Sequence, residues 1–380
     1  MNLLSALALT LLWASPARVH VYDSVVDVSV KKSGAGTPGP SGPTREALAT
    51  LTRYAVCRAL PDGTLRWASD LRATRKEDAW VLSWPNSRAG LARKAAVQAH
   101  WTRPGSSALP AGLEVVEFEN PSSLRVTWGK NPGALLFMLC HPNAFVPSAD
   151  AAYLPSSRGY RANERAAWGQ PFFAEMVVRE RTEKDARVAL AAGRTDLVLG
   201  LPGEEKRSMR FGTSLVATPD AAAALACLRD AVDRADLAAH FVDAPAEPWA
   251  ALAGEKPAPR APGDTATCPP ATLSFHTEWP SQARIAARLQ IAAKRRGLAL
   301  TLAPLPEGAP AAPGLELATH LLPPDEVLAT ALLHAAHGPH VVPLVLEGVG
   351  VRTSPTRLRP VEFDAFGLPL LDDLERTDSP

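Results

Sequence analysis

Three histidines in the last fifty residues have the clearest spacing for chemistry. His334, His337 and His340 are three residues apart, so the first two would share a face of a helix, where two imidazoles can begin a metal site. Gly338 and Pro339 would break that helix before the third histidine joins the face. No carboxylate or cysteine lies close to them in sequence. We therefore expect a polar helix end and no metal site.

Motifs that mark common enzyme classes are not found. The sequence has no G-x-S-x-G nucleophile elbow, no Walker loop, no H-E-x-x-H, and no G-x-G-x-x-G pattern that follows a predicted strand. Glu204 and Glu205 follow Gly203 in a polar loop, where paired carboxylates are usually solvated. We expect neither an enzyme nor a cofactor. A secreted hydrolase would need a nucleophile and a base that only the folded chain brings together.

The first residues have the pattern of a secretory signal peptide. An apolar run from Leu3 to Ala14 is followed by Ser15 and Ala17, which are spaced for cleavage after Ala17. No Lys or Arg precedes the run, and a hydrophobic first strand or a short buried helix is the alternative. The run is too short to span a bilayer, and no cysteine near it could carry a lipid anchor. We expect residues 1–17 to be a signal peptide and the protein to be periplasmic.

Composition predicts a folded chain of two or three domains. The 380 residues are 46% hydrophobic and 21% charged, which suits packed cores and does not fit disorder. The 40 basic and 39 acidic residues leave a net charge of +1. A charge this balanced provides no basic surface for nucleic acid, so no nucleic-acid partner is expected.

Four cysteines lie far apart in sequence, which disfavours a zinc knuckle or a redox pair. They are Cys57, Cys140, Cys227 and Cys268. An even number in an exported chain permits two disulfides, and four buried free thiols are the alternative.

Two stretches have the order strand, helix, strand. In the first, β-prone residues 176–181 precede a helical run over 184–192, which Gly193 can end, and a buried strand over 196–199. In the second, residues 272–278 alternate as a strand. Pro280 and Ser281 open a helix, with Ser281 as its N-cap.

That second helix has Ile285, Leu289 and Ala292 on one face and ends at Gly297, before a strand over 298–302. The two units together predict parallel sheet covered by helices, which is an α/β architecture. Residues 113–119 and 122–128 instead form a hairpin pattern around Asn120 and Pro121, typical of a mixed α+β region.

In this order the segments resemble the extracellular solute-binding proteins of the oligopeptide, dipeptide and nickel ABC transporters (family 5). The strongest match begins with GYRANERAAWGQPFFAEMVVR at residue 159 and ends with ALAAGRTDLVLG, the first strand–helix–strand unit. Weaker matches lie at residues 53–71, 80–84, 116–128, 139–148, 228–242, 285–302 and 341–354. The chain looks like a divergent and shortened member.

The resemblance implies a two-lobed, periplasmic-binding-protein-like fold of class II with an extra subdomain in the first lobe. It places the first part of lobe I at 18–45, the extra subdomain at 46–158, more of lobe I at 159–218, lobe II at 219–342 and a return to lobe I at 343–380. Chain crossings between the lobes are expected at Leu215–Pro219 and Val341–Leu344. It also implies disulfides within each lobe, Cys57–Cys140 and Cys227–Cys268.

By position in the family, Tyr160, His320 and Asp325 are implied as ligand-binding residues. Each has a simpler alternative: a loop aromatic, a surface histidine and a helix N-cap. The family's glycine turn is reduced to SSRGY at 156–160, and its acidic peptide-binding segment to ELATHLLPPDEV at 316–327. The resemblance therefore leaves open whether the ligand is a peptide.

The function that the resemblance implies is transport. A monomeric protein would bind a small solute or short peptide and deliver it to the permease subunits of an ABC importer. The alternative is a repurposed binding fold that acts as a sensor or interaction module without transport.

Overall fold

The computed structural model describes the chain in separate segments. They are residues 25–31, 42–103, 113–128, 135–168, 171–202, 208–229, 231–242, 246–249, 268–277, 279–306, 309, 311–321, 329–330, 333–334 and 337–377. The predicted signal peptide and Asp325 lie outside these residues. None of the described helices is long and apolar enough to cross a membrane.

The first predicted strand–helix–strand unit is confirmed. It consists of β12 (Glu175–Arg181), α4 (Glu183–Ala191) and β13 (Leu197–Pro202). The Thr182 hydroxyl accepts the Asp185 N–H at the start of α4, and Gly193 follows its end with a φ of 63°. The first described strand, β1 (Val25–Lys31), lies between β12 and β13 and is parallel to both.

A glycine pattern follows β1 after all. Residues 34–39 read GAGTPG and stand between β1 and α1 (Gly42–Ala49), so the expectation that no such pattern follows a strand was wrong. β1 is a strand that no pattern in the sequence had indicated. Residues 34–39 themselves lie outside the described residues.

The second unit is also confirmed, with one correction at its helix start. β16 (Ala271–His276), α7 (Pro280–Arg295) and β17 (Leu300–Leu305) follow each other, and the two strands are parallel. The N-cap of α7 is Trp279 and not Ser281. Because Pro280 takes the first helical position, Ser281 lies within the first turn and its hydroxyl turns away from the helix.

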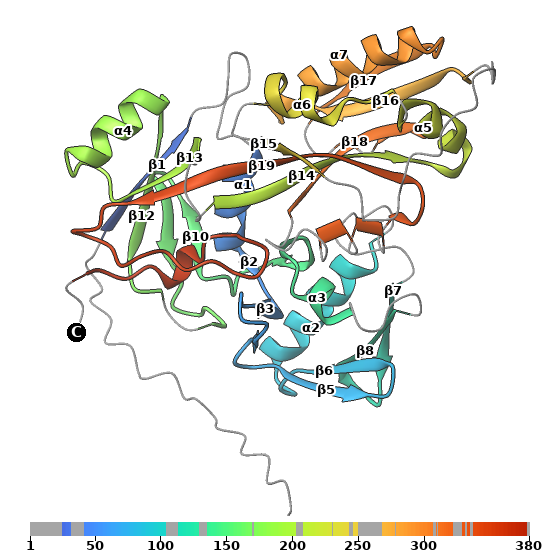
Figure 1. Ribbon diagram of the computed structural model, residues 1–380. Coiled ribbons are helices and arrows are strands. Elements are labelled where there is room, and N and C mark those ends of the chain that lie inside the picture. Colours follow the sequence, from blue (N-terminus) through green and yellow to red (C-terminus); the bar gives the residue numbers. More distant parts are fainter. Residues whose placement is uncertain are drawn as a thin grey trace, which may run out of the picture.

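One sheet joins both units. Its strand order is β10-β11-β12-β1-β13-β19-β14-β18-β16-β17, with β15 also paired to β19. The long strands β14 (Ser208–Ala217) and β19 (Val341–Thr353) are antiparallel and run side by side across the middle of the molecule (Figure 1). β18 (Leu315–Leu321) pairs antiparallel with β14 and parallel with β16.

The remaining described elements complete the two lobes. They are η1 (Thr50–Thr52), β2 (Arg53–Tyr54), β3 (Cys57–Ala59), β4 (Leu65–Trp67), α3 (Leu135–Leu139), η2 (Pro142–Ala144), β9 (Val146–Pro147), β10 (Tyr153–Ser156), β11 (Gly159–Ala162), η3 (Pro219–Ala221), α5 (Ala222–Arg229), α6 (Arg234–His240), β15 (Ala246–Pro248) and η4 (Leu371–Asp373).

Two hydrophobic cores meet along β14 and β19. On β14, Phe211 packs into the larger core, which we call the core of lobe I, and Leu215 into the core of lobe II. On β19, Val349 belongs to the first core and Val345 to the second. On β14 and β19 the chain therefore passes between the cores within a continuous strand, and β18 does the same, with Leu317 in the second core and Leu321 in the first.

These points lie a few residues toward lobe I from the crossings predicted at Leu215–Pro219 and Val341–Leu344. The difference arises because both strands extend unbroken through the junction, and no loop marks it. The residue limits predicted for the lobes and the subdomain stay a prediction.

The predicted hairpin belongs to a separate four-stranded sheet of order β5-β6-β8-β7, which lies apart from the main sheet (Figure 1). The strands of this sheet are β5 (Arg72–Lys76), β6 (Ala79–Ser83), β7 (Leu113–Phe118) and β8 (Asn120–Trp128). The helix α2 (Arg88–Trp101) lies between β6 and β7 in the chain. The hairpin turns at Glu119, which has a φ of 60°, and not at Asn120 and Pro121.

Both implied disulfides are present. Cys57 and Cys140 have Cα atoms 4.8 Å apart, and Cys227 and Cys268 have Cα atoms 6.1 Å apart. The first pair belongs to the lobe I core and the second to the lobe II core. The pairing within each lobe is therefore confirmed, and the alternative of four free thiols is wrong.

Candidate functional site

The lobe II part of the main sheet has one apolar and one polar face. Helices α5 and α7 cover the apolar face, where their buried side chains share a core with the strands. Strand residues in this core include Leu215, Leu273, Phe275, Leu315 and Leu317. Because side chains alternate along a strand, the residues between them point to the other face. Those are Ser214, Ser274, His276, Glu316 and His320, which we call the histidine face.

Contacts connect this face with a histidine from another segment. Ser214 Oγ and His320 Nε2 share a hydrogen bond of 2.7 Å. The His320 ring lies against His337, with centroids 5.3 Å apart. His276 Nε2 lies 3.8 Å from Glu316 Oε1. The face thus places polar side chains on three neighbouring strands, β14, β18 and β16.

Two imidazoles at this face, those of His320 and His337, are held in the neutral form. Burial lowers the pKa of His320 to about 3, and the neighbouring His337 and His141 act in the same direction. Burial also lowers the pKa of His337, against the opposing effect of Glu316. A neutral imidazole has one donor and one acceptor nitrogen. The rings of His320 and His337 can therefore donate a hydrogen bond to a solute or accept one from it.

Lobe I reaches the end of this face through His141. The Nδ1 atom of His141 accepts the Asn143 N–H at 3.1 Å, so Nε2 carries the proton and donates to the Leu321 carbonyl oxygen at 3.2 Å. Leu321 is the last residue of β18 and follows His320 directly. Burial lowers the pKa of His141 to about 4. This hydrogen bond holds His141 against the end of β18, next to the histidine face, where the Leu321 side chain packs in the lobe I core.

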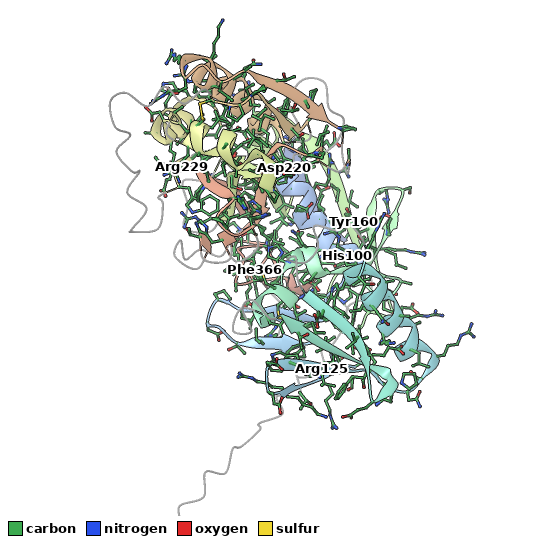
Figure 2. All side chains as sticks on the ribbon, turned by 90° about the vertical axis from the view of Figure 1, so that its right-hand side faces the viewer. His100, Arg125, Tyr160, Asp220, Arg229 and Phe366 are labelled. Atoms are coloured by element: carbon green, nitrogen blue, oxygen red, sulfur yellow. A yellow bond between two sulfur atoms is a disulfide. The ribbon has the colours of Figure 1, made fainter. Side chains whose placement is uncertain are left out.

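The position of His141 is fixed from two sides. The preceding residue, Cys140, is tied to β3 by its disulfide with Cys57. Phe366, from the last described segment, packs edge-on against the His141 ring with centroids 4.7 Å apart. In Figure 2, Phe366 lies between Arg125 of the subdomain and Arg229 of lobe II. The carboxyl-terminal segment therefore supports the lobe I side of the site.

A serine beside an imidazole is also the arrangement of a nucleophile and its general base. Here Ser214 is fully buried, with an exposed fraction of 0%. A base whose pKa is about 3 has little affinity for the proton of a hydroxyl near neutral pH. These properties favour a hydrogen-bonding role for the pair over a nucleophilic one.

The structure places two of the three predicted site residues and separates them. His320 lies on the histidine face and is partly buried, and this burial lowers its pKa, which disfavours the alternative of a surface histidine. Tyr160 lies on β11, with five strands between it and β18, and packs against the lobe I core. Burial raises the pKa of Tyr160. Asp325 lies outside the described residues. Ligand-binding roles for all three stay a prediction.

Several residues of the site were not identified from the sequence. Glu316, Ala318 and His320 alternate with Leu315 and Leu317, and the same alternation puts Ser274 and His276 on one side of β16. This period of two was a usable signal for a strand with one polar face. His141 had no such signal, because only folding brings it to Leu321, which is 180 residues away.

The histidines at 334, 337 and 340 do not act together. His337 contacts His320, whereas His334 Nδ1 lies 3.2 Å from the Gly338 carbonyl oxygen. Among the described residues, no three His, Cys, Asp or Glu side chains are placed to hold a metal ion.

A surface groove of about 630 Å³ lies elsewhere, on lobe I, between the end of α4 and the end of β19. Arg187, Leu190, Arg352 and Ser354 are among the residues that line it, and no residue of the histidine face does. The groove is separate from the contact between the lobes.

No family model matches the sequence, and no curated protein matches it. Solved structures do match the fold. The murein tripeptide binding protein MppA of Escherichia coli is 10% identical, with a TM-score of 0.57, and the match covers 94% of this chain and 99% of that one. A substrate binding protein from Microbacterium hydrocarbonoxydans, complexed with 4-hydroxybenzoate hydrazide, is 12% identical, with a TM-score of 0.57 and coverages of 93% and 99%.

NikA from Staphylococcus aureus, in complex with Ni(L-His)2, is 11% identical, with a TM-score of 0.52 and coverages of 91% and 98%. Identities this low establish the fold alone. The chain has the α/β, two-lobed fold of the periplasmic-binding-protein-like structures, as the resemblance in sequence implied.

Proposed function

We propose that this chain is a periplasmic solute-binding protein that delivers a peptide or another small solute to an ABC importer. The observation that carries the proposal is the junction of the lobes. Continuous strands carry residues of two separate cores, and the histidine face of lobe II lies next to His141 of lobe I. Two lobes joined by strand crossings, with polar groups between them, are suited to close around a solute.

Closure would work by contacts that only the closed form makes. β14, β18 and β19 are the elements that would bend, since each of these strands carries residues of both cores. His320 and Ser214 would present hydrogen-bonding groups from lobe II, and His141 would approach from lobe I. Because the imidazoles are neutral, they would bind polar groups without adding a net positive charge.

The similar structures support a small solute without fixing its class. By their descriptions, one binds Ni(L-His)2, one mannopinic acid and one 4-hydroxybenzoate hydrazide, and another is a murein tripeptide binding protein. Peptide therefore remains one option among several for this chain.

Mass spectrometry of the natively purified protein tests the proposal. We expect a periplasmic extract to yield protein with a stoichiometric small molecule that denaturation releases. Small-angle X-ray scattering should then show a decrease in the radius of gyration when that molecule is returned to the emptied protein. The His320→Ala variant should lose the bound molecule, and the His240→Ala variant, at an exposed position on α6, should keep it. An empty protein that never compacts would contradict transport.

One observation favours the alternative of a repurposed binding fold. His141 of lobe I makes a direct hydrogen bond to the Leu321 carbonyl oxygen at the end of β18, the strand that also carries the histidine face. A protein that stays closed and empty would act through its surface, as a sensor or an interaction module. The scattering experiment separates the two functions, because this protein would already be compact and would not respond to solute.

Export and a monomeric state are part of the proposal. Mass spectrometry of the intact periplasmic protein should give a chain that begins at Arg18, after cleavage of residues 1–17. Size-exclusion chromatography with light scattering should give the mass of one chain. A cytoplasmic location would contradict delivery to an importer.

A further inference from the structure

Helix α7 carries positive charge on the side that faces away from the sheet. The helix contains no Asp or Glu, and its carboxyl end has three consecutive exposed cations, Lys294, Arg295 and the C-cap residue Arg296. Arg284, near the start of the helix, is exposed as well. In Figure 1, α7 lies at the outer edge of lobe II, next to β16 and β17. Because the whole chain carries a net charge of only +1, these cations are a local excess.

Acidic side chains neutralise little of this charge. Arg288, on the flank of α7 toward α6, pairs with Asp236 at 2.7 Å. Within the part of the chain that the structure describes, no Asp or Glu forms an ion pair with Lys294 or Arg295. The neighbouring strand β17 contributes no charged residue. The helix dipole favours cations at the carboxyl end, but it does not account for a helix that has no acidic residue along its whole length.

A large apolar side chain lies among these cations. Ile291 is 48% exposed, whereas Ile285 and Leu289 of the same helix are buried. Residues three and four apart share one face of a helix, so Ile291 lies beside Lys294 and Arg295 on the outward side. An exposed isoleucine keeps apolar surface in contact with water, and contact with an apolar partner would remove it.

We call these outward residues the basic face of α7: Arg284, Ile291, Lys294 and Arg295. The first and last lie eleven residues apart, about 16 Å along the helix axis, so the face is extended and is not a site for a single anion. Cations attract a surface of anionic headgroups, and an apolar side chain among them can enter the boundary between the headgroups and the acyl chains. The cations and the isoleucine together therefore fit a membrane surface.

We propose that the basic face of α7 attaches the protein reversibly to a membrane surface rich in anionic phospholipid, with Ile291 inserted between the headgroups. The histidine face lies on the opposite side of the lobe II sheet, so attachment through α7 leaves it uncovered. The inference goes beyond the proposed function and needs no solute. A few cations and one isoleucine give weak binding, so the attachment depends strongly on salt.

Sedimentation of the full-length protein with lipid vesicles tests the proposal. Vesicles of phosphatidylglycerol and phosphatidylcholine in a molar ratio of about 1:2 provide the anionic surface, and vesicles of phosphatidylcholine alone are the neutral control. We expect the protein to sediment with the anionic vesicles and not with the neutral ones. Raising NaCl to about 0.5 M should release it, because salt screens the attraction.

Variants of exposed residues locate the binding surface. Lys294→Gln/Arg295→Gln should lower the partition coefficient for anionic vesicles at least about tenfold, and Ile291→Gln should lower it by a smaller factor. Arg75→Gln/Lys76→Gln is the matched control, because it also removes one arginine and one lysine from adjacent exposed positions, here on β5. This control should bind as the unaltered protein does. Thermal unfolding of each variant should confirm that it is folded, since every substituted side chain is exposed.

The outcomes separate this inference from the proposed function. Loss of vesicle binding in the α7 variants alone supports the basic face. No binding to anionic vesicles, or binding that Lys294→Gln/Arg295→Gln retains, would overturn it. A dimer in light scattering that Ile291→Gln abolishes would assign the face to a second copy of the chain and overturn it as well. Solute uptake and compaction without vesicle binding would keep the transport function and overturn this inference alone.

Discussion

The Ser281 hydroxyl donates a hydrogen bond of 3.0 Å to Glu347 Oε1 and so connects α7 to β19 at the junction of the lobes. Thr213 of β14 donates to the same oxygen at 3.4 Å. Trp279, just before α7, packs against Phe211 of the lobe I core, while the rest of the helix packs in lobe II. Glu347 is therefore the group at which the lobe II helix and both crossing strands meet.

The ionisation of Glu347 should make stability depend on pH. Burial raises the pKa of Glu347, although hydrogen bonds from Ser281 and Thr213 act the other way. A raised pKa means that the folded state holds this proton more tightly than the unfolded state. The resulting stabilisation is complete below the unfolded pKa and is lost as pH rises through the folded one.

Glu347→Gln keeps the acceptor oxygen and removes this titration. We expect the variant to be more stable than the unaltered protein at pH 8, with the difference shrinking toward pH 4. Urea unfolding at both pH values measures it. A difference that does not change with pH would mean that Glu347 has the same pKa in the folded and unfolded states.

Local features of the sequence predicted much of this fold because local interactions decide them. Gly193 and Gly297 each end a helix with a positive φ, of 63° and 75°, as their positions indicated. Both strand–helix–strand units formed where hydrophobic periodicity placed them. The disulfide pairs came from the resemblance, since spacing alone leaves three pairings of four cysteines open.

The site was harder to predict because its contacts are not local. Ser214 and His320 are 106 residues apart and meet only when β14 pairs with β18. Ser281 looked like a helix cap, but Glu347 takes its hydroxyl, and a tertiary contact of this kind leaves no local pattern. The points at which the chain passes between the cores were displaced for a related reason, since continuous strands carry no turn residues to mark a junction.

Acid should destabilise the protein through His141 and His320. Burial lowers their pKa values to about 4 and about 3, below the ordinary histidine value of about 6.5. The unfolded state therefore takes up protons first, and stability is complete above about pH 6.5 and falls as pH drops toward the folded pKa values. For His141 alone the loss is on the order of 3 kcal/mol.

Unfolding by urea at pH 7, 5.5 and 4.5 measures this loss. His141→Gln should lower stability at pH 7, because a packed ring is lost, but should flatten the acid dependence. His240→Gln, at the exposed end of α6, should leave the acid dependence unchanged. Equal acid dependence in all three proteins would mean that other groups control it.

Arg58 should be among the most sensitive residues of lobe I. It binds both carboxylate oxygens of Asp372, at 2.5 and 3.0 Å, and its guanidinium lies 4.8 Å from the Trp168 ring centre. Both partners of the ion pair are about nine-tenths buried. Arg58→Ala leaves Asp372 buried without its counter-ion, so we expect a loss of about 3–5 kcal/mol in urea unfolding.

Arg359→Ala is the matched control for Arg58. Arg359 pairs with Glu375 at 2.8 Å, but the arginine side chain is 47% exposed. Removing an exposed pair should cost less than about 1 kcal/mol. Similar losses for the two variants would contradict the importance given to burial.

The two disulfides should differ in their effect on the site. Cys57–Cys140 closes a loop of 83 residues and holds the residue before His141, whereas Cys227–Cys268 closes 41 residues within lobe II. Replacing either pair with alanine should lower the free energy of unfolding by about 2–5 kcal/mol, with the longer loop at the upper end.

Only the loss of Cys57–Cys140 should also free His141 from Leu321. Hydrogen exchange of the segment around Asn143, whose N–H binds His141 Nδ1, measures that release. Faster exchange there in Cys57→Ala/Cys140→Ala, and not in Cys227→Ala/Cys268→Ala, would show that the first disulfide positions the lobe I side of the site. Equal exchange in both variants would reduce its role to stability alone.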